Sequence, residues 1–278
     1  PYYQDYQLKT NEEENDYSGL IHFIDVLNHT PSAALPAAIE PIADVSDILN
    51  GLAVSNVFAP LDSYIGSAHN FYMYQRSDNG RMMHILWDAN MSFGTFRFGS
   101  SVNPPLLSPL FLPAPASTQP RPLSSKLWAV PAYQRRYLRA MAQMLRSGFD
   151  TVAMQAEIER LAALIRPDVA ADPRKFYTIE QFDTNLYNTI IAEATIYGLR
   201  TFVTQRAAHL KTQLNLLAAK TDIALNELMP VNASTIQDGS GEYDPWIELY
   251  NLGPGRVDLA GLTLTDDPSN PTRWALPA

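Results

Sequence analysis

The pattern of apolar and polar positions predicts two helices in the first sixty residues. After Asp16, apolar side chains recur three or four positions apart, the spacing of one helix face, and Asp16 or Ser18 can cap the helix. The same period returns after the proline-punctuated stretch 31–41 and predicts a second helix. The apolar faces consist of Leu20, Phe23, Ile24 and Leu27 in the first helix and of Val45, Ile48, Leu49 and Leu52 in the second.

The next segment has the pattern of a β-hairpin. Residues 70–76 and 82–87 are rich in aromatic and β-favouring side chains, and between them lies SDNGR, a strong turn signal. If the Asn-Gly pair alone forms the turn, Asn70 pairs with Ala89 and points to the face opposite that of Asp88. If Asp-Asn-Gly forms a three-residue loop, Asn70 lies opposite Asp88, about 5 Å away between Cβ atoms. We expect the second register.

Beyond the hairpin, the proline-rich stretch 101–125 is predicted to be a long loop or a partly disordered insertion, because proline cannot continue regular structure. Helix-period apolar positions then return over 131–147, 150–165 and 179–219. These ranges predict an α-helical block.

At Thr221 the pattern changes to short alternating runs separated by Gly, Pro and Asp, which predict strands. About three strands precede the end of the sequence, too few for a stable sandwich, so we expect the given chain to end inside a β-domain. The expected fold is α+β, with a mainly helical domain and a hairpin over 1–220 and an incomplete all-β segment over 221–278.

Composition limits the classes of function. A helix needs about 20 apolar residues in a row to cross a bilayer, and no apolar run in the 278 residues approaches that length. We therefore expect no membrane span. The chain has no cysteine, which excludes disulfides, thiolate catalysis and cysteine-ligated zinc. It begins PYYQDYQLKT, without Met or a signal peptide, so we expect processing or truncation to have removed any targeting segment.

The net charge of −9 is unevenly distributed. Residues 223–278 carry eight acidic and two basic side chains, a net of −6, whereas 131–220 carry eight acidic and twelve basic ones, a net of +4. An acidic C-terminal segment argues against general nucleic-acid binding, because neutralising phosphates requires a basic face. We therefore expect no nucleic-acid partner.

Candidate chemistry is concentrated around the hairpin. The loop LDSYIGSAHN, directly before the first strand, contains Asp62, His69 and Asn70, and Asp88 follows the second strand. A carboxylate such as Asp62 can orient an acceptor hydroxyl, and the oxygens of Asn70 and Asp88 suit a hard cation such as Mg²⁺. These are the parts that phosphoryl transfer requires. On spacing alone a structural interpretation stays open, with Asp62 capping a turn, His69 in the core and Asp88 closing the hairpin.

Other chemistry has weaker support. Ser63, His69 and Asp62 are the residue types of a hydrolase triad, but no nucleophile-elbow motif accompanies them. The five histidines show none of the paired spacings typical of zinc sites.

An acidic segment near the end of the chain, DGSGEYD, contains Asp238, Glu242 and Asp244, which could bind calcium. It lacks the full ligand set and the terminal bidentate Glu of a dedicated calcium loop. We therefore expect an acidic surface turn.

The segment 56–94, NVFAPLDSYIGSAHNFYMYQRSDNGRMMHILWDANMSFG, resembles the signature region of the CotH family of atypical protein kinases. The resemblance extends back into YSGLIHFIDVLN and forward through FVTQRAAHLKTQL, over roughly residues 1–220. It implies a kinase-like C-terminal lobe in which Asp62 and His69 are catalytic, while Asn70 and Asp88 bind metal and nucleotide.

Two departures from the family pattern change these expectations. Asn90 occupies a place where another acidic residue is often found, which would weaken one metal ligand. A kinase also needs a nucleotide-binding lobe with a phosphate-binding Lys or Arg, yet Lys9 is the one Lys or Arg before Asp62. We expect the chain to be a fragment of a longer protein or a non-catalytic remnant.

The C-terminal segment resembles the first half of a lamin-tail domain, an immunoglobulin-like sandwich attached to secreted and surface proteins. The sequences IALNELMP and WIELYNLG carry the resemblance. It implies a binding or anchoring module for a cell-surface or envelope component, with no catalytic residue.

Together these observations predict an extracytoplasmic atypical protein kinase that uses ATP with Mg²⁺ or Mn²⁺ to phosphorylate Ser or Thr of a protein substrate. The alternative, from a different class, is a non-catalytic surface or adhesion protein built on the same domains.

Overall fold

The computed structural model describes most of the chain, in two compact units that we treat separately: 1–213 and 214–278. No helix in the described part is both long and apolar enough to cross a bilayer. The described residues are 6–96, 102–114, 120–191, 195–217, 223–251, 257, 259, 262–267, 269–270 and 272–276.

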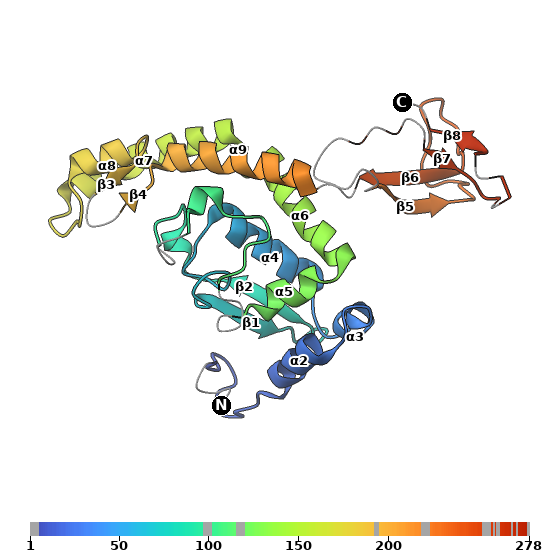
Figure 1. The fold of residues 1–278 in the computed structure, drawn as a ribbon, viewed down its shortest axis with the longest axis horizontal. Coiled ribbons are helices and arrows are strands. Elements are labelled where there is room, and N and C mark those ends of the chain that lie inside the picture. The colour runs from blue at the N-terminus through green and yellow to red at the C-terminus, as the bar shows by residue number, and fades with distance from the viewer. Residues whose placement is uncertain are drawn as a thin grey trace. The chain divides into compact units, whose positions relative to one another are not determined.

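The described part of the first unit is mainly helical, with two small antiparallel sheets (Figure 1). Its α-helices are α2 (Ser18–His29), α3 (Leu35–Ile39), α4 (Val45–Phe58), α5 (Pro122–Trp128), α6 (Pro131–Arg146), α7 (Thr151–Ala171), α8 (Ile179–Asn185) and α9 (Leu199–Leu217). Its strands and 3-10 helices are β1 (Phe71–Gln75), β2 (Met82–Leu86), β3 (Ile190–Ile191), β4 (Thr195–Ile196), η1 (Ala89–Met91) and η2 (Pro104–Leu106).

Helix α4 lies at the centre of this unit and packs against both α6 and β2. Asp44 caps its first turn by accepting a hydrogen bond from the backbone N–H of Asp47, at 3.0 Å. The predicted apolar face of α4 is buried, as are Phe23 and Leu27 of α2, so both predicted helices are confirmed. Because α4 ends directly before the loop that contains Asp62, its packing fixes where that loop begins.

A buried arginine joins α9 to the end of α4. Arg206 is fully buried, and its guanidinium donates to the backbone carbonyls of Asn56, Val57, Pro105 and Leu107 and to the side-chain oxygen of Asn56. Burial lowers the pKa of Arg206 to about 9. In the described part of the chain its hydrogen-bond acceptors are all neutral, so the arginine satisfies carbonyls at the α4 C-terminus that the helix itself leaves unpaired.

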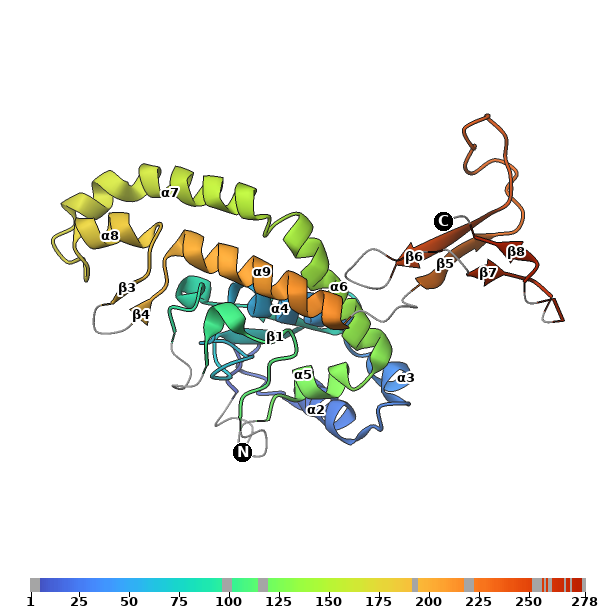
Figure 2. The same cartoon turned by 45° about the horizontal axis from the view of Figure 1, so that its top comes forward.

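The helical block after residue 131 differs from its prediction. Helix α7 continues through Pro167 to Ala171, and the predicted helical range 179–219 is interrupted by the β3–β4 hairpin between α8 and α9. Figures 1 and 2 show α7 leading away from the α2–α6 region and α9 returning beside it. An ion pair between Arg200 and Glu159, at 2.7 Å, links α9 to α7. The spacing of apolar residues alone did not locate the β3–β4 hairpin within the predicted helical range.

The proline-rich stretch is more regular than predicted. It contains η2, and α5 begins at Pro122. Proline suits the first turn of a helix, because a backbone N–H at that position would have no partner within the helix. Residues 101 and 115–119 lie outside the described part of the chain.

The register predicted for the hairpin is wrong. Phe71 pairs with Leu86 and Gln75 with Met82, so the loop contains four residues, 77–80, instead of three. The backbone N–H of Gly80, whose φ is 71°, donates to the carbonyl of Arg76 at 2.9 Å. This longer loop shifts the strands by one residue relative to the prediction.

In its described residues, the second unit contains two antiparallel strand pairs. β5 (Ile223–Met229) pairs with β6 (Trp246–Asn251), with a register shift between Leu225 and Glu227, and β7 (Thr263–Leu264) pairs with β8 (Trp274–Ala275). An open groove of about 640 Å³ lies between these strands, with Leu225, Leu228 and Ile247 among its lining residues. The predicted strands are present, and their assignment to a lamin-tail domain stays a prediction.

Candidate functional site

The loop between α4 and β1, residues 59–70, is held by its own backbone. The N–H of Ser67 donates to the carbonyl of Leu61 at 2.9 Å, and the N–H groups of Gly66 and Ala68 both donate to the carbonyl of Ser63. A Cβ atom at Gly66 would lie 1.9 Å from the carbonyl oxygen of Leu61. The loop therefore requires glycine at this position, because any side chain would collide with backbone.

Residues that follow the proline-rich stretch hold the loop from outside. The guanidinium of Arg121, which is 7% exposed, donates to the carbonyl of Gly66. In return, the hydroxyl of Tyr64 accepts a hydrogen bond from the backbone N–H of Leu123, at 2.8 Å. Sequence reasoning missed these contacts, because Arg121 and Leu123 are more than fifty residues away along the chain.

Asp62, near the start of this loop, and Asn70, at its end, contact each other directly. The Asn70 amide nitrogen donates to the Asp62 carbonyl at 2.7 Å and to its carboxylate Oδ2 at 3.1 Å. The hydroxyl of Ser67 donates to the other carboxylate oxygen, Oδ1, at 2.7 Å. The carboxylate is thus oriented by two donors while its side chain remains 25% exposed. The sequence analysis placed Asp62 and Asn70 in one site without predicting a bond between them, and it did not identify Ser67.

His69 lies at the surface, so the structural interpretation that placed it in the core is wrong. Its side chain is 73% exposed, and its Nδ1 atom lies 3.9 Å from the Asp62 carboxylate. At that distance it is an ion-pair partner only when protonated, and it is too far for a hydrogen bond. The hydrolase triad would also need Ser63, which is buried.

Asp88 follows β2 and begins η1 in the left-handed conformation, with φ 49° and ψ 60°. Its side chain is exposed and does not cap η1. The observed register places Asn70 opposite Trp87, where the Trp87 N–H donates to the Asn70 carbonyl at 3.2 Å. Asp88 is therefore one residue beyond the position opposite Asn70, and the predicted direct pairing of these two residues is wrong.

The chain bends sharply after Asp88. Phe93 and Gly94 have φ values of 59° and 74°, and the Phe93 N–H donates to the carbonyl of Phe58 at 2.8 Å. The Phe93 ring packs edge-on against Phe58 and Phe202. This bend fixes the segment after Asp88 to the end of α4.

The second strand of the hairpin contains a buried histidine. His84 of β2 is 4% exposed and stacks on Phe71, and among the residues that the structure describes neither of its ring nitrogens has a hydrogen-bond partner. Burial lowers the pKa of His84 to about 4, because the charged form would lose its hydration. His84 is therefore a neutral packing residue at neutral pH.

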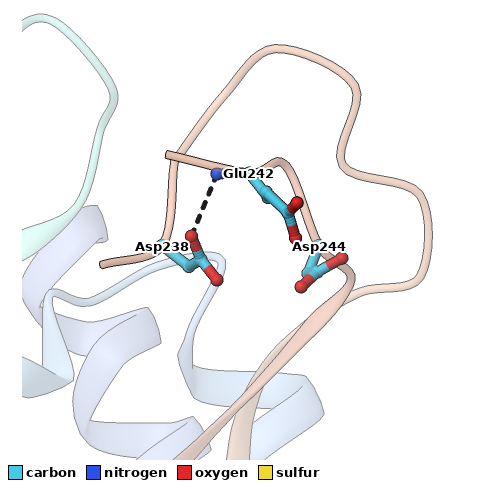
Figure 3. Close-up of side chains that lie close together, drawn as sticks. All are labelled: Asp238, Glu242 and Asp244. Carbon is cyan, nitrogen blue, oxygen red and sulfur yellow. Dashed lines mark hydrogen bonds between the residues drawn. The ribbon is translucent and has the colours of Figure 1, made fainter. Parts of the chain in front are cut away.

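The acidic segment of the second unit brings its three carboxylates together. Ligand atoms of Asp238, Glu242 and Asp244 lie within 4.8 Å of one another, and all three residues are exposed (Figure 3). The Asp238 carboxylate accepts hydrogen bonds from the N–H groups of Ser240 and Glu242, at 2.8 and 2.9 Å, and these bonds lower its pKa. The geometry is that of a turn closed by an aspartate.

The similarity to known proteins extends over most of the first unit. The sequence profile of the family described as CotH kinase protein matches residues 1–210. Inner spore coat protein H of Bacillus subtilis (strain 168) is 26% identical over 217 residues, which represent 76% of this chain and 52% of that protein. The chain thus spans about half the length of this curated relative. The matched range contains α2 to α8 and the whole loop-and-hairpin site, and the chain belongs to the CotH kinase protein family.

Proposed function

We propose that this protein is a CotH-type atypical protein kinase, which transfers the γ-phosphoryl group of ATP to Ser or Thr hydroxyls of another protein. The observation that carries the proposal is the pairing of Asp62 with Asn70 before the hairpin, together with Asp88 directly after it. Membership of the CotH kinase protein family supports it.

The side chains of this site suit a divalent cation. Asn70 uses its amide nitrogen for Asp62, so the oxygen of the same amide is not involved in that bond. The exposed carboxylate of Asp88 supplies a second oxygen ligand, and Mg²⁺ and Mn²⁺ favour such oxygens. When bound, the metal would neutralise charge on the phosphates. Asn90, also exposed, adds an amide where a further carboxylate would bind more strongly.

Asp62 is proposed to act on the acceptor hydroxyl. Its carboxylate, held by Ser67 and Asn70, would accept the hydroxyl proton as the hydroxyl oxygen bonds to the γ-phosphorus and the bond to the β-phosphate oxygen breaks. ADP and a phosphorylated protein are the products. His69, 3.9 Å from the carboxylate, would add positive charge near the site when protonated.

The substrate is proposed to be a spore-coat or other surface protein outside the cytoplasm. The support for this location is the similarity to a relative named as an inner spore coat protein. We propose that the second unit, as a lamin-tail module, attaches the enzyme to a cell-surface or envelope component. Its open groove with exposed Leu225 and Leu228 is the feature that suits such a role.

A non-catalytic surface-binding protein is the second candidate function. The observation that favours it is that both oxygens of the Asp62 carboxylate accept hydrogen bonds from within the loop, as they would in a purely structural turn. The two candidate functions differ in one requirement: the kinase needs the negative charge of Asp62, whereas a purely structural turn does not.

Transfer of the γ-phosphate tests the proposal. The intact protein would be assayed with labelled ATP and Mg²⁺, then Mn²⁺, on itself and on a Ser-rich acceptor, beside Asp62→Asn and Asp88→Asn. We expect each variant to lose at least about 100-fold in rate. Asp168→Asn, at an exposed position on α7, is the matched control and should retain full activity. Absence of both transfer and nucleotide binding in the folded protein would favour the binding protein.

A further inference from the structure

Helix α6 contains four arginines and no acidic residue. Because a helix turns by about 100° per residue, the four lie within a sector of about 100° around the helix axis. The buried side chains of α6 lie on the other side of the helix, which packs against α4 and α5. A row of positive charge, about 16 Å long, thus faces away from the core. This arginine row consists of Arg135, Arg136, Arg139 and Arg146.

The arginine row has few carboxylate partners. Four arginines elsewhere on the first unit each pair with a carboxylate at 2.6 or 2.7 Å, namely Arg76, Arg160, Arg166 and Arg200. Within the described residues, Arg135, Arg136 and Arg146 form no ion pair of this kind. Like charges one turn apart destabilise a helix, so the row lowers the stability of α6 unless an anion neutralises it.

The guanidinium groups of the row act on one another. Burial, and then the positive charges of Arg136 and Arg146, lower the pKa of Arg139. Arg136 is also held in place, because its Nη1 atom donates to the hydroxyl of Ser46 at 3.1 Å and its guanidinium lies 5.8 Å from the centre of the Tyr133 ring. At least one guanidinium of the row is therefore positioned before any partner binds.

The arginine row is separate from the residues proposed to react. Arg136 contacts the first turn of α4 at Ser46, whereas the loop that contains Asp62 begins after the last residue of α4, Phe58. At the rise of an α-helix, Ser46 and Phe58 are about 18 Å apart. Because an extended polypeptide covers about 3.3 Å per residue, a chain bound at both places would have several residues between them.

We propose that the arginine row binds phosphoserine or phosphothreonine of a polypeptide that this protein has already phosphorylated, and so holds that polypeptide while a further hydroxyl reaches Asp62. The inference rests on the proposed function, because the phosphorylated polypeptide is its product. A guanidinium matches two phosphate oxygens with parallel hydrogen bonds, and a phosphate carries about two negative charges where a carboxylate carries one.

The charge of the whole chain favours a short phosphorylated segment over a nucleic acid. The net charge of the chain is −9, so a long polyanion would meet repulsion beyond the row. A phosphorylated segment of a few residues contacts the row alone. All four basic residues on the exposed side of α6 are arginines, whose planar fork suits phosphate better than the single point charge of lysine.

Binding of a labelled Ser-Gly peptide with two phosphoserines tests the inference without catalysis. Fluorescence anisotropy with the intact protein would be measured without ATP and with EDTA, so that no divalent cation contributes. We expect this peptide to bind about tenfold more tightly than the same peptide with Ser or Glu in place of phosphoserine. Arg135→Ala combined with Arg146→Ala should remove most of that difference. Arg81→Ala combined with Arg174→Ala, at exposed positions outside the row, removes the same charge and should bind as the unaltered protein does.

Transfer kinetics relate the docked phosphate to the reaction. One acceptor peptide carries phosphoserine about eight residues from the acceptor Ser, and a second carries it directly beside that Ser. We expect the first to have a KM about tenfold below that of the unphosphorylated peptide, and the second to show no such gain, because its phosphate cannot reach α6. The double variant of Arg135 and Arg146 should lose this advantage while it unfolds at the same urea concentration as the unaltered protein.

Several results would overturn the inference. Equal binding of the phosphoserine and Ser peptides, or an unchanged preference in the double variant of Arg135 and Arg146, would remove the docking site and leave the proposed kinase activity intact. Equal binding of the Glu peptide would make the partner an acidic segment instead of a phosphorylated one. An equal loss in the double variant of Arg81 and Arg174 would show that only net charge matters. Absence of transfer to every peptide would overturn the proposed function, and with it the assignment of the phosphorylated partner as its product.

Discussion

The side-chain amide of Asn70 donates hydrogen bonds to both the backbone carbonyl and the carboxylate of Asp62, at 2.7 and 3.1 Å. Asn70 is in the left-handed conformation, with φ 53°, directly before β1. The contact therefore ties the first polar residue of the loop to the start of the hairpin. The residues that shape the loop are the same residues to which we assign the chemistry.

Replacing Asn70 tests how much this contact stabilises the loop. Asn70→Ala should lower the free energy of unfolding by about 2 kcal/mol, because it removes a hydrogen bond to a carboxylate and places Ala at positive φ. Asn70→Gly loses the same hydrogen bonds but adopts positive φ freely, so it should be more stable than Asn70→Ala by about 1 kcal/mol. Urea unfolding measures both. Equal stability of Asn70→Ala and the unaltered protein would contradict the structural role of the contact.

Gly66 should tolerate no side chain. Gly66→Ala places a Cβ atom 1.9 Å from the Leu61 carbonyl oxygen, so the loop must open, and we expect a loss of stability of about 2 kcal/mol or more. Nucleotide binding should weaken with it, because Asp62 and Asn70 would separate. Gly148→Ala, where a Cβ atom meets no atom of the described residues within 4 Å, is the control and should unfold at the same denaturant concentration as the unaltered protein.

Arg206 is expected to contribute strongly to the stability of the first unit. Arg206→Met keeps a long apolar stem but leaves the carbonyls of Asn56, Val57 and Leu107 without donors, which should cost about 3 kcal/mol or more. The matched change Arg160→Met, at a side chain 61% exposed on α7, should change stability by less than about 0.5 kcal/mol. Similar unfolding midpoints for the two variants would show that water replaces the guanidinium at no cost.

His84 should make the protein sensitive to mild acid. The pKa of His84 is lowered from 6.5 to about 4 in the folded state, so between these values the unfolded chain binds a proton that the folded chain does not. The contribution of neutral His84 to the free energy of unfolding is complete above pH 6.5. This contribution, about 3 kcal/mol in total, is lost as the pH falls towards 4. The Asp47 carboxylate accepts the His84 backbone N–H at 2.9 Å, and the lowered pKa of the ring is due to burial.

Urea unfolding at pH 7.0, 5.5 and 4.5 tests this expectation. His84→Leu should flatten the decline between pH 6.5 and 4.5 relative to the unaltered protein. His22→Gln, at an exposed position on α2, should leave the decline unchanged. Parallel curves for His84→Leu and the unaltered protein would show that other groups cause any acid sensitivity.

The sequence predicted those features that depend on neighbouring residues. The apolar faces of α2 and α4 were read correctly because one helix face repeats every three to four positions, and the hairpin was found because SDNGR is a strong turn signal. Asp62 and Asn70 were chosen for one site because both lie in one short loop, and the structure joins them by hydrogen bonds.

The error in the hairpin register arose because a turn motif does not specify the length of its loop. The motif SDNGR predicts a loop of two or three residues, whereas the observed loop has four. The loop is closed by Gly80 and by an ion pair between Arg76 and Asp78, at 2.6 Å, whose geometry cannot be read from turn preferences. The shift of one residue placed Trp87, and not Asp88, opposite Asn70.

The sequence by itself thus determined the order of helices, hairpin and strands, the family, and which polar residues share a loop. The tertiary structure alone decided how that loop is held, because Arg121 and Leu123 bond to Gly66 and Tyr64 across more than fifty positions of the chain. It also decided that His69 is exposed and His84 buried. Burial depends on which segments pack over a residue, and residue type and spacing do not specify that.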